Sequence, residues 1–289
     1  MLYKLKLFFY ELCKEMNQIR VFLGKKEEDS LFYLTKLARC CHILDKGCYT
    51  VPFEKNHSLG IYEEAKEYLS KIEPDLYKDD SCYLWCVERI KRYEALQKEG
   101  TESTPVYFNP TIYKDSKEYD GFIESFISVR RFCEDIIPND IINKCISVAQ
   151  SASSSCFRQT PRCYAIKSKE MINELTKNIA GLTGFSNGVP LLICITSDIR
   201  AYDCIDRNLA YIDATLFSQN LVLSLRNKNI FSVFLNFQQA TKSDINSVRK
   251  ILKIPEYEKV IIFIACGYSN FISEKPKRLN LEKVGKIYE

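Results

Sequence analysis

One stretch in the last part of the chain limits the fold most strongly. Residues 259–265, Lys-Val-Ile-Ile-Phe-Ile-Ala, are almost entirely apolar and rich in β-branched side chains. A strand of this composition needs cover on both faces, as the central strand of a sheet between helices has. Shorter apolar segments with the pattern of strands lie at 163–167, 190–196 and 230–235. The sequence therefore predicts a sheet with helices on both faces.

Helical periodicity fills the segments between these strands. One helix is expected to begin within residues 136–140, with Asn139 or Asp140 as its cap, and to end near Ser151. Three more helices are expected over about 168–179, 205–228 and 241–252.

The N-terminal part of the chain has a different pattern. From residue 2 to about 98, apolar side chains recur at helical spacing, including a short amphipathic stripe over the first sixteen residues. Residues 99–117 are rich in Gly, Ser, Thr and Pro and have the composition of a linker. We therefore expect a helical segment over residues 1–116 and an α+β domain over residues 117–289.

Composition excludes several classes of protein. The 289 residues are 46% hydrophobic and 27% charged, which is ordinary for a soluble globular protein. The basic residues behind the net charge of +4 are scattered, so no nucleic-acid surface is expected. The apolar run at the start is too short and too interrupted for a membrane span or a secretory signal.

Cysteine usage indicates the compartment. Thirteen cysteines, an odd number, occur with only two histidines, and their spacing does not match a zinc site. Buried free thiols are expected in preference to a metal or disulfides, which places the chain in a reducing cytoplasm.

Two polar segments contain the residues best suited to hold a ligand. Ser128-Val-Arg-Arg-Phe132 combines a hydroxyl with two guanidinium groups, and residues 153–161 combine three serines with Arg158 and Gln159. Such groups bind phosphates and the polar edges of heterocycles. In an extended segment Ser128 and Arg130 would share one side, with Arg131 facing away. A solvated basic turn and an irregular loop at a helix end are the alternative interpretations.

These two segments and their spacing resemble the FMN-dependent nitroreductase family. The resemblance implies an α+β fold with a mixed β-sheet flanked by helices, here preceded by an all-helical N-terminal segment. It also implies an intertwined homodimer with FMN bound at the interface, where Ser128 and Arg130 would hold the flavin phosphate. Phe126 stands where the family has a further Arg.

The same resemblance assigns the second segment to the flavin ring. In the family the corresponding loop contacts the ring across the dimer interface. It is represented here by Ser153, Ser154, Ser155, Arg158 and Gln159. Phe157 stands where an Asn is usual, so an amide able to bind the flavin edge is replaced by an aromatic ring.

Two later segments complete the resemblance. Leu235 and Asn236 follow a strand whose end lies against the flavin ring in similar proteins, and the Asn236 N–H would face flavin N5. Lys277 and Arg278 match the basic residues that bind the phosphate, with Lys275 as a further candidate. A solvated basic tail is the alternative interpretation of this cluster.

The helical segment has a signal of its own. Cys41-His-Ile-Leu-Asp-Lys-Gly47 resembles a His-x-x-Glu-Lys-Gly motif of nitroreductase-like proteins that have an extra helical segment and are associated with polysaccharide biosynthesis. The alternative is an ordinary helix end with Gly47 as the cap.

The function implied is transfer of hydride from NAD(P)H through FMN to a small organic acceptor. Because the cofactor would supply the chemistry, no catalytic acid, base, nucleophile or metal is assigned. The sequence contains no Gly-x-Ser-x-Gly, Gly-x-Gly-x-x-Gly or Walker motif, so a hydrolase or a Rossmann dehydrogenase has no support. The alternative function is a non-redox binding or regulatory protein on a degenerate nitroreductase fold, motivated by Phe126 and Phe157.

Overall fold

The computed structural model describes residues 27–49, 54–99, 116–271, 275 and 277–289, together with isolated positions among the first nineteen. The amphipathic helix expected over the first sixteen residues lies outside these ranges, apart from those isolated positions. Most of the expected linker also lies outside them, so the domain boundary at residue 116 stays a prediction.

A four-stranded antiparallel sheet forms the centre of the C-terminal part. Its spatial order is β1-β2-β4-β3, so β2 and β4 are its inner strands. The four strands predicted from the sequence are confirmed to within two residues at each end. Their bounds are β1 Pro161–Ile166, β2 Leu191–Asp198, β3 Phe231–Leu235 and β4 Glu258–Gly267.

One parallel contact lies outside these strands. Ser128 forms an isolated parallel bridge with Ser232 of β3, and the Val129 N–H donates to the Ser232 carbonyl over 3.1 Å. The sequence predicted a mixed sheet, with parallel and antiparallel pairs. Among the described residues this bridge is the one parallel pairing, and it places the Ser128–Arg130 segment along β3.

The four helices predicted for this part are present, with two corrections. The bounds are α6 Ser116–Glu124, α7 Asn139–Ala149, α8 Lys169–Thr176, α9 Leu209–Arg226 and α10 Lys242–Leu252. Helix α6 was not predicted, and α8 ends three residues earlier than expected. The cap of α7 is Pro138, not Asn139 or Asp140, because Pro138 has the extended backbone of a cap and Asn139 is already helical. The helix predicted from residue 205 begins at Leu209, because residues 204–206 form a separate 3-10 turn, η5 Cys204–Asp206.

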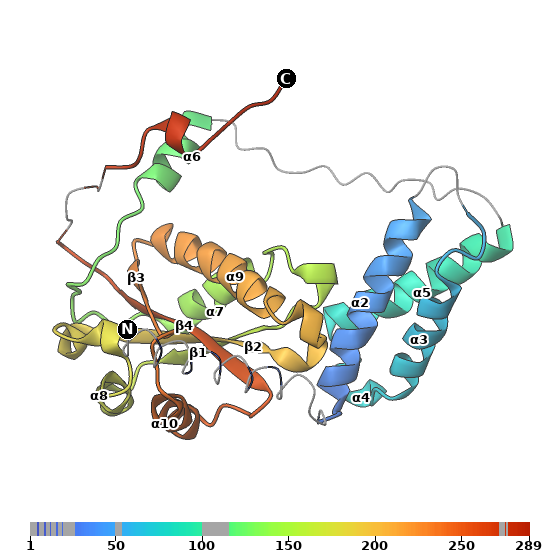
Figure 1. Ribbon diagram of the computed structural model, residues 1–289, viewed down its shortest axis with the longest axis horizontal. Helices are drawn as coiled ribbons and strands as arrows, with labels where there is room; N and C mark the ends of the chain where they lie inside the picture. Colours follow the sequence, from blue (N-terminus) through green and yellow to red (C-terminus); the bar gives the residue numbers. More distant parts are fainter. Residues whose placement is uncertain are drawn as a thin grey trace.

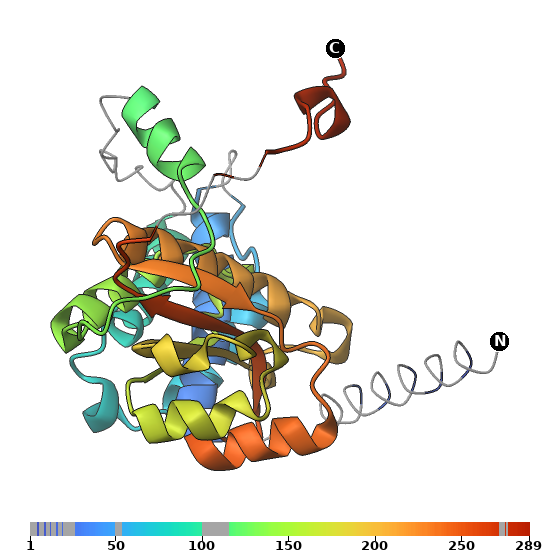
Figure 2. The same cartoon turned by 90° about the vertical axis from the view of Figure 1, so that its left-hand side faces the viewer.

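Helices cover both faces of the sheet, as Figures 1 and 2 show. On one face Leu191, Ile193 and Ile195 of β2 pack with side chains of α7 and α9. On the other face Leu192 and Cys194 pack with side chains of α8 and α10. Alternating residues of the same strand thus enter two different cores, which is why the inner strands are apolar throughout.

The described residues 27–49 and 54–99 form what we call the helical module, which has a core of its own. Its helices are α2 Ser30–Cys48, α3 Leu59–Ser70, α4 Pro74–Tyr77 and α5 Ser81–Glu99. The expectation that Gly47 caps a helix is wrong, because α2 continues to Cys48 and Tyr49 is the cap. A Cβ on Gly47 would lie 2.1 Å from the His57 ring, so close packing of the imidazole requires the glycine.

One buried arginine joins the module to the sheet. Arg200 lies in η4 (Ile199–Ala201), just after β2, and its guanidinium pairs with Asp198 over 2.7 Å and with Asp29 of the module over 3.0 Å. The same guanidinium lies 3.5 Å from the centroid of the Tyr257 ring. Figure 1 shows the module at this side of the sheet, beside the N-terminal end of α9.

The C-terminal residues 277–289 and α6 lie away from the sheet and its helices in both views (Figures 1 and 2). Every residue of 277–289 is exposed, including five large apolar side chains. These are Leu279, Leu281, Val284, Ile287 and Tyr288. Among the residues described, no helix has the length and apolarity needed to cross a bilayer.

We predict that Arg200→Leu destabilises the chain by about 3 to 5 kcal/mol, because it leaves the buried carboxylate of Asp198 without its partner. Urea unfolding followed by circular dichroism measures the loss. The double change Asp198→Leu with Arg200→Leu should recover most of it, since both members of the fully buried pair are then removed and only the partly exposed Asp29 and Arg162 lose a partner. A single variant within about 1 kcal/mol of the parent would contradict this role for the pair.

Candidate functional site

The loop between α7 and β1, residues 153–160, is called the site loop. Three of its non-glycine residues have left-handed backbone conformations: Cys156, Phe157 and Gln159, with φ of 49°, 58° and 51°. Each such residue costs roughly 1 kcal/mol or more, so the surroundings must hold the loop in place.

Asp213 of α9 holds the start of the loop. Its carboxylate is buried and accepts from the Ser155 N–H over 2.9 Å, from the Ser155 hydroxyl over 2.7 Å and from the Tyr202 hydroxyl over 2.7 Å. A buried carboxylate needs such donors, because it has lost its hydration. Ser155 was predicted to contact a flavin ring, and in this structure its N–H and hydroxyl bind Asp213 of α9.

Tyr202 extends this network to the end of the loop. Its hydroxyl lies 2.6 Å from the Thr160 hydroxyl, which in turn accepts from Ser197 over 2.9 Å. Burial raises the pKa of Tyr202 well above its ordinary value, and the bond to Asp213 acts in the same direction. The phenol therefore stays protonated and remains a donor to Asp213.

The predicted residue Arg158 is buried within the protein. Its Nε donates to the Ala201 carbonyl over 3.0 Å, its Nη1 donates to the Ser155 carbonyl, and its Nη2 pairs with Asp206 over 3.0 Å. These bonds fasten the site loop to the segment after β2. A flavin contact of Arg158 stays a prediction, while its structural role was not foreseen from the sequence.

Phe157 and Gln159 face the helical module. The Phe157 ring lies 4.9 Å from the Trp85 ring and 6.2 Å from the His42 ring, and the Gln159 amide donates to Cys82 Sγ over 3.2 Å. Phe157, which stands where the family has an Asn, thus gives the site loop an aromatic side chain that packs against the module. No local sequence signal pairs residues so far apart, so Trp85 and Cys82 were not predicted here.

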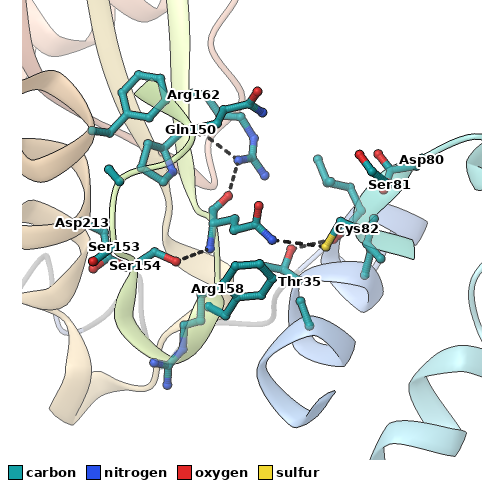
Figure 3. Close-up of a pocket in the computed structure, with 18 of the residues that line it drawn as sticks. Thr35, Asp80, Ser81, Cys82, Gln150, Ser153, Ser154, Arg158, Arg162 and Asp213 are labelled. Carbon is teal, nitrogen blue, oxygen red and sulfur yellow. Dashed lines mark hydrogen bonds between the residues drawn. The ribbon is translucent and has the colours of Figure 1, made fainter. Parts of the chain in front are cut away.

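An open cavity of about 690 Å³ lies between the site loop and the module. Figure 3 shows Arg162 and Gln150 on the sheet side, Ser153 and Ser154 on the loop, and Asp80, Ser81 and Cys82 at the start of α5. Of the predicted residues, Ser153, Ser154, Arg158 and Gln159 line it. A volume of this size accommodates a ring system of the dimensions of a cofactor or a small aromatic substrate.

The other predicted residues lie elsewhere. Ser128 and Arg130 are exposed, while Ile127 and Val129 between and beside them are buried, which is the alternation expected of an extended segment. Arg131 lies with its guanidinium 5.7 Å from the centroid of the Phe271 ring.

The end of β3 and the tail contain the last four predicted residues. Leu235 is buried and Asn236 is exposed, with its Oδ1 accepting from the Gln238 N–H over 2.9 Å. Lys277 and Arg278 are exposed on the tail and make no hydrogen bond or ion pair within the described part of the chain. Lys275 lies 3.5 Å from Glu124 of α6.

Helix α9 separates the two groups of predicted residues. Asp213 near its start binds Ser155, whereas Arg226 at its end lies 4.4 Å from the centroid of the Phe231 ring, next to the bridge with Ser128. Arg226 follows Asp213 by thirteen residues in the helix, which corresponds to a rise of about 20 Å. One chain therefore does not bring the site loop to the Ser128–Arg130 segment.

The cysteines near the loop differ in their surroundings. Burial raises the pKa of Cys163 to about 12, so its thiol is protonated at neutral pH and a poor nucleophile. Cys156 is exposed on the loop.

Comparison with known proteins identifies the fold. No protein-family model matches the sequence. The FMN-dependent nitroreductase of Clostridium difficile R20291 superposes with a TM-score of 0.52 at 20% identity, over 58% of this chain and 98% of the other. The NADPH:FMN oxidoreductase of Vibrio harveyi, solved with NAD+, superposes with a TM-score of 0.51 at 19% identity, over 59% of this chain and 76% of the other.

The chain has the nitroreductase fold. A curated relative, an NADPH-dependent oxidoreductase of Staphylococcus aureus (strain bovine RF122 / ET3-1), is 26% identical over 163 residues, or 51% of this chain. The chain spans 63% of that relative's length. Because the C. difficile enzyme is matched almost completely by 58% of this chain, about two fifths of the chain has no counterpart in it. We infer that the helical module lies within that added part.

We predict that Asp213→Ala destabilises the chain by about 2 to 4 kcal/mol, since it leaves the Ser155 N–H, the Ser155 hydroxyl and the Tyr202 hydroxyl without an acceptor. Ser155→Ala removes one of these donors and should cost about 1 kcal/mol. Chemical unfolding measures both values. Asp135→Ala, at an exposed aspartate, is the control, and an equal loss in all three variants would argue against the network.

Proposed function

We propose that the chain is an FMN-dependent oxidoreductase that takes hydride from NAD(P)H and reduces a small organic acceptor. The observation that supports this most directly is the Ser128–Arg130 segment. Its hydroxyl and guanidinium are exposed on one side of an extended segment fixed to β3 of a nitroreductase fold. A hydroxyl and a guanidinium together suit a phosphate.

The polar groups fit FMN in two parts. Ser128 and Arg130 would hold the phosphate, and the exposed Asn236 at the end of β3 would lie toward the ring. The polar edge of the flavin ring would be contacted by Ser153, Ser154 and Gln159. These residues lie at the other end of α9 from the Ser128–Arg130 segment. The fit therefore calls for the site loop of a second copy of the chain.

Exposed apolar surface supports a homodimer. Ile212 and Leu216 of α9 are 51% and 43% exposed, and the tail contributes further exposed apolar side chains. Apolar side chains grouped on one helix and one tail suit a protein interface. A symmetric dimer would also give Lys277 and Arg278 a second chain to contact.

The bound flavin would supply the hydride chemistry. The protein's own residues would hold the phosphate, orient the ring and limit access, which is why no general acid or base is assigned. Action in the cytoplasm and in polysaccharide biosynthesis are further proposals, the latter supported by the resemblance around His42.

A non-redox binding protein is the second candidate. It is favoured by three side chains that would contact the flavin in the family pattern but have other contacts here. Phe126 packs against the core beneath α7 and α9, Phe157 packs against Trp85, and Arg158 binds Asp206.

The purified chain should carry FMN, and Ser128→Ala combined with Arg130→Ala should weaken FMN binding by about tenfold to a hundredfold, because two phosphate contacts are lost. Visible absorbance of the purified protein, followed by titration with FMN, measures this. Bleaching of the bound flavin by NAD(P)H then tests the hydride donor.

Arg131→Ala is the matched control, since Arg131 is exposed beside Arg130 but stacks on Phe271. It should retain FMN. A colourless parent chain that takes up no added FMN would favour the binding protein, and equal FMN retention by the double variant would remove Ser128 and Arg130 from the site.

A further inference from the structure

We propose that the amphipathic stripe at the start of the chain forms the seam of a parallel two-stranded coiled coil with a second copy of the chain. The flavin site proposed above uses none of the residues of this stripe. The inference starts from their spacing, which is regular from residue 2 to residue 23.

The apolar residues of the stripe follow one another at intervals of three and four positions in strict alternation. They are Leu2, Leu5, Phe9, Leu12, Met16, Ile19 and Leu23. This is heptad spacing, which assigns every one of them to an a or a d position. A helix packed on a globular core needs a broader apolar face, whereas a seam of a and d positions suits pairing with one other helix.

The members of the stripe that the structure describes agree with this assignment. Leu5, Phe9, Leu12, Met16 and Ile19 are all helical. Of these, Leu5, Leu12 and Met16 are 55%, 42% and 48% exposed. The hydrophobic cores formed by the described residues contain none of the five. Apolar side chains exposed along one line of a helix favour burial against a second surface.

Charges beside the seam favour a second copy in parallel orientation. In this heptad frame Glu15 takes a g position and Arg20 takes the following e position. In a parallel pair each g residue faces the next e residue of the partner helix, so two copies would form two reciprocal contacts between Glu15 and Arg20. An antiparallel pair sets e against e and g against g, which would lose both contacts.

The side of the helix opposite the seam argues against a membrane as the occupant. A helix that lies on a membrane has a polar face rich in Lys and Arg. Here that face has Lys4 and Lys14, but also Glu11, Asn17 and Gln18. A face of mixed charge suits the outer surface of a coiled coil in water. The two-fold axis of a parallel coiled coil is also compatible with the symmetric homodimer proposed above.

Cross-linking of the full-length chain tests the seam. Leu5→Cys places a thiol at a d position, and a parallel pair brings the two d positions together, so mild oxidation should yield a covalent dimer that a reducing agent releases. Lys14→Cys is the matched control, because it places the thiol at an f position on the outer side. It should form no more dimer than the parent chain, which sets the contribution of the thirteen native cysteines.

Charge reversal tests the orientation. Glu15→Lys, added to the Leu5→Cys chain, turns two attractive contacts into two repulsive ones. It should raise the protein concentration needed for half-maximal cross-linking by about tenfold. Adding Arg20→Glu restores opposite charges and should recover the original value. Glu11→Lys makes the same charge change at a c position away from the seam and should have no effect.

Equal cross-linking of the Leu5→Cys and Lys14→Cys chains, or no response to charge reversal, would overturn the proposal. So would binding of the parent chain to vesicles of phosphatidylcholine and phosphatidylserine without cross-linking at Leu5, since lipid would then cover the stripe. Cross-linking requires no bound flavin. A chain that takes up no FMN would therefore overturn the proposed function and leave the test of the seam unaffected.

Discussion

The arrangement of the two parts of this chain depends on the burial of one guanidinium. Asp198 ends β2 inside the protein, where a lone carboxylate would be strongly unfavourable, and Arg200 two residues later neutralises it. The same guanidinium reaches Asp29 at the start of α2 and thereby fixes the first helix of the module against the sheet. The module then lies over the site loop, and the cavity exists because of that placement.

Most of the fold could be predicted because its signals are local. Strands β2 and β4 are apolar throughout since their alternating side chains enter two cores, and this is visible in a short window of sequence. Element ends were less predictable. Pro138 serves as the cap of α7. Gly47 lies inside α2, where the His57 ring packs so closely that only glycine fits, and local patterns do not encode this contact.

The candidate site was predictable in its segments but not in its contacts. The residue types of the site loop indicated a ligand, and the alternation around Val129 is as expected. The contacts of Arg158 could not be predicted, because its partners Ala201 and Asp206 lie more than forty residues further along the chain. Similarly, nothing near Phe157 in the sequence points to Trp85. Long-range contacts decide which polar groups face a ligand, and a single sequence does not contain them.

The left-handed residues of the site loop have a consequence for how ligands would enter. Because Cys156, Phe157 and Gln159 are held in unfavourable conformations by Asp213, Arg158 and Tyr202, the conformational cost of the loop is met when the chain folds. An incoming molecule then meets a surface already in its final shape. Association of a ligand in this cavity would then be limited by diffusion and desolvation, because little loop ordering is left to oppose it.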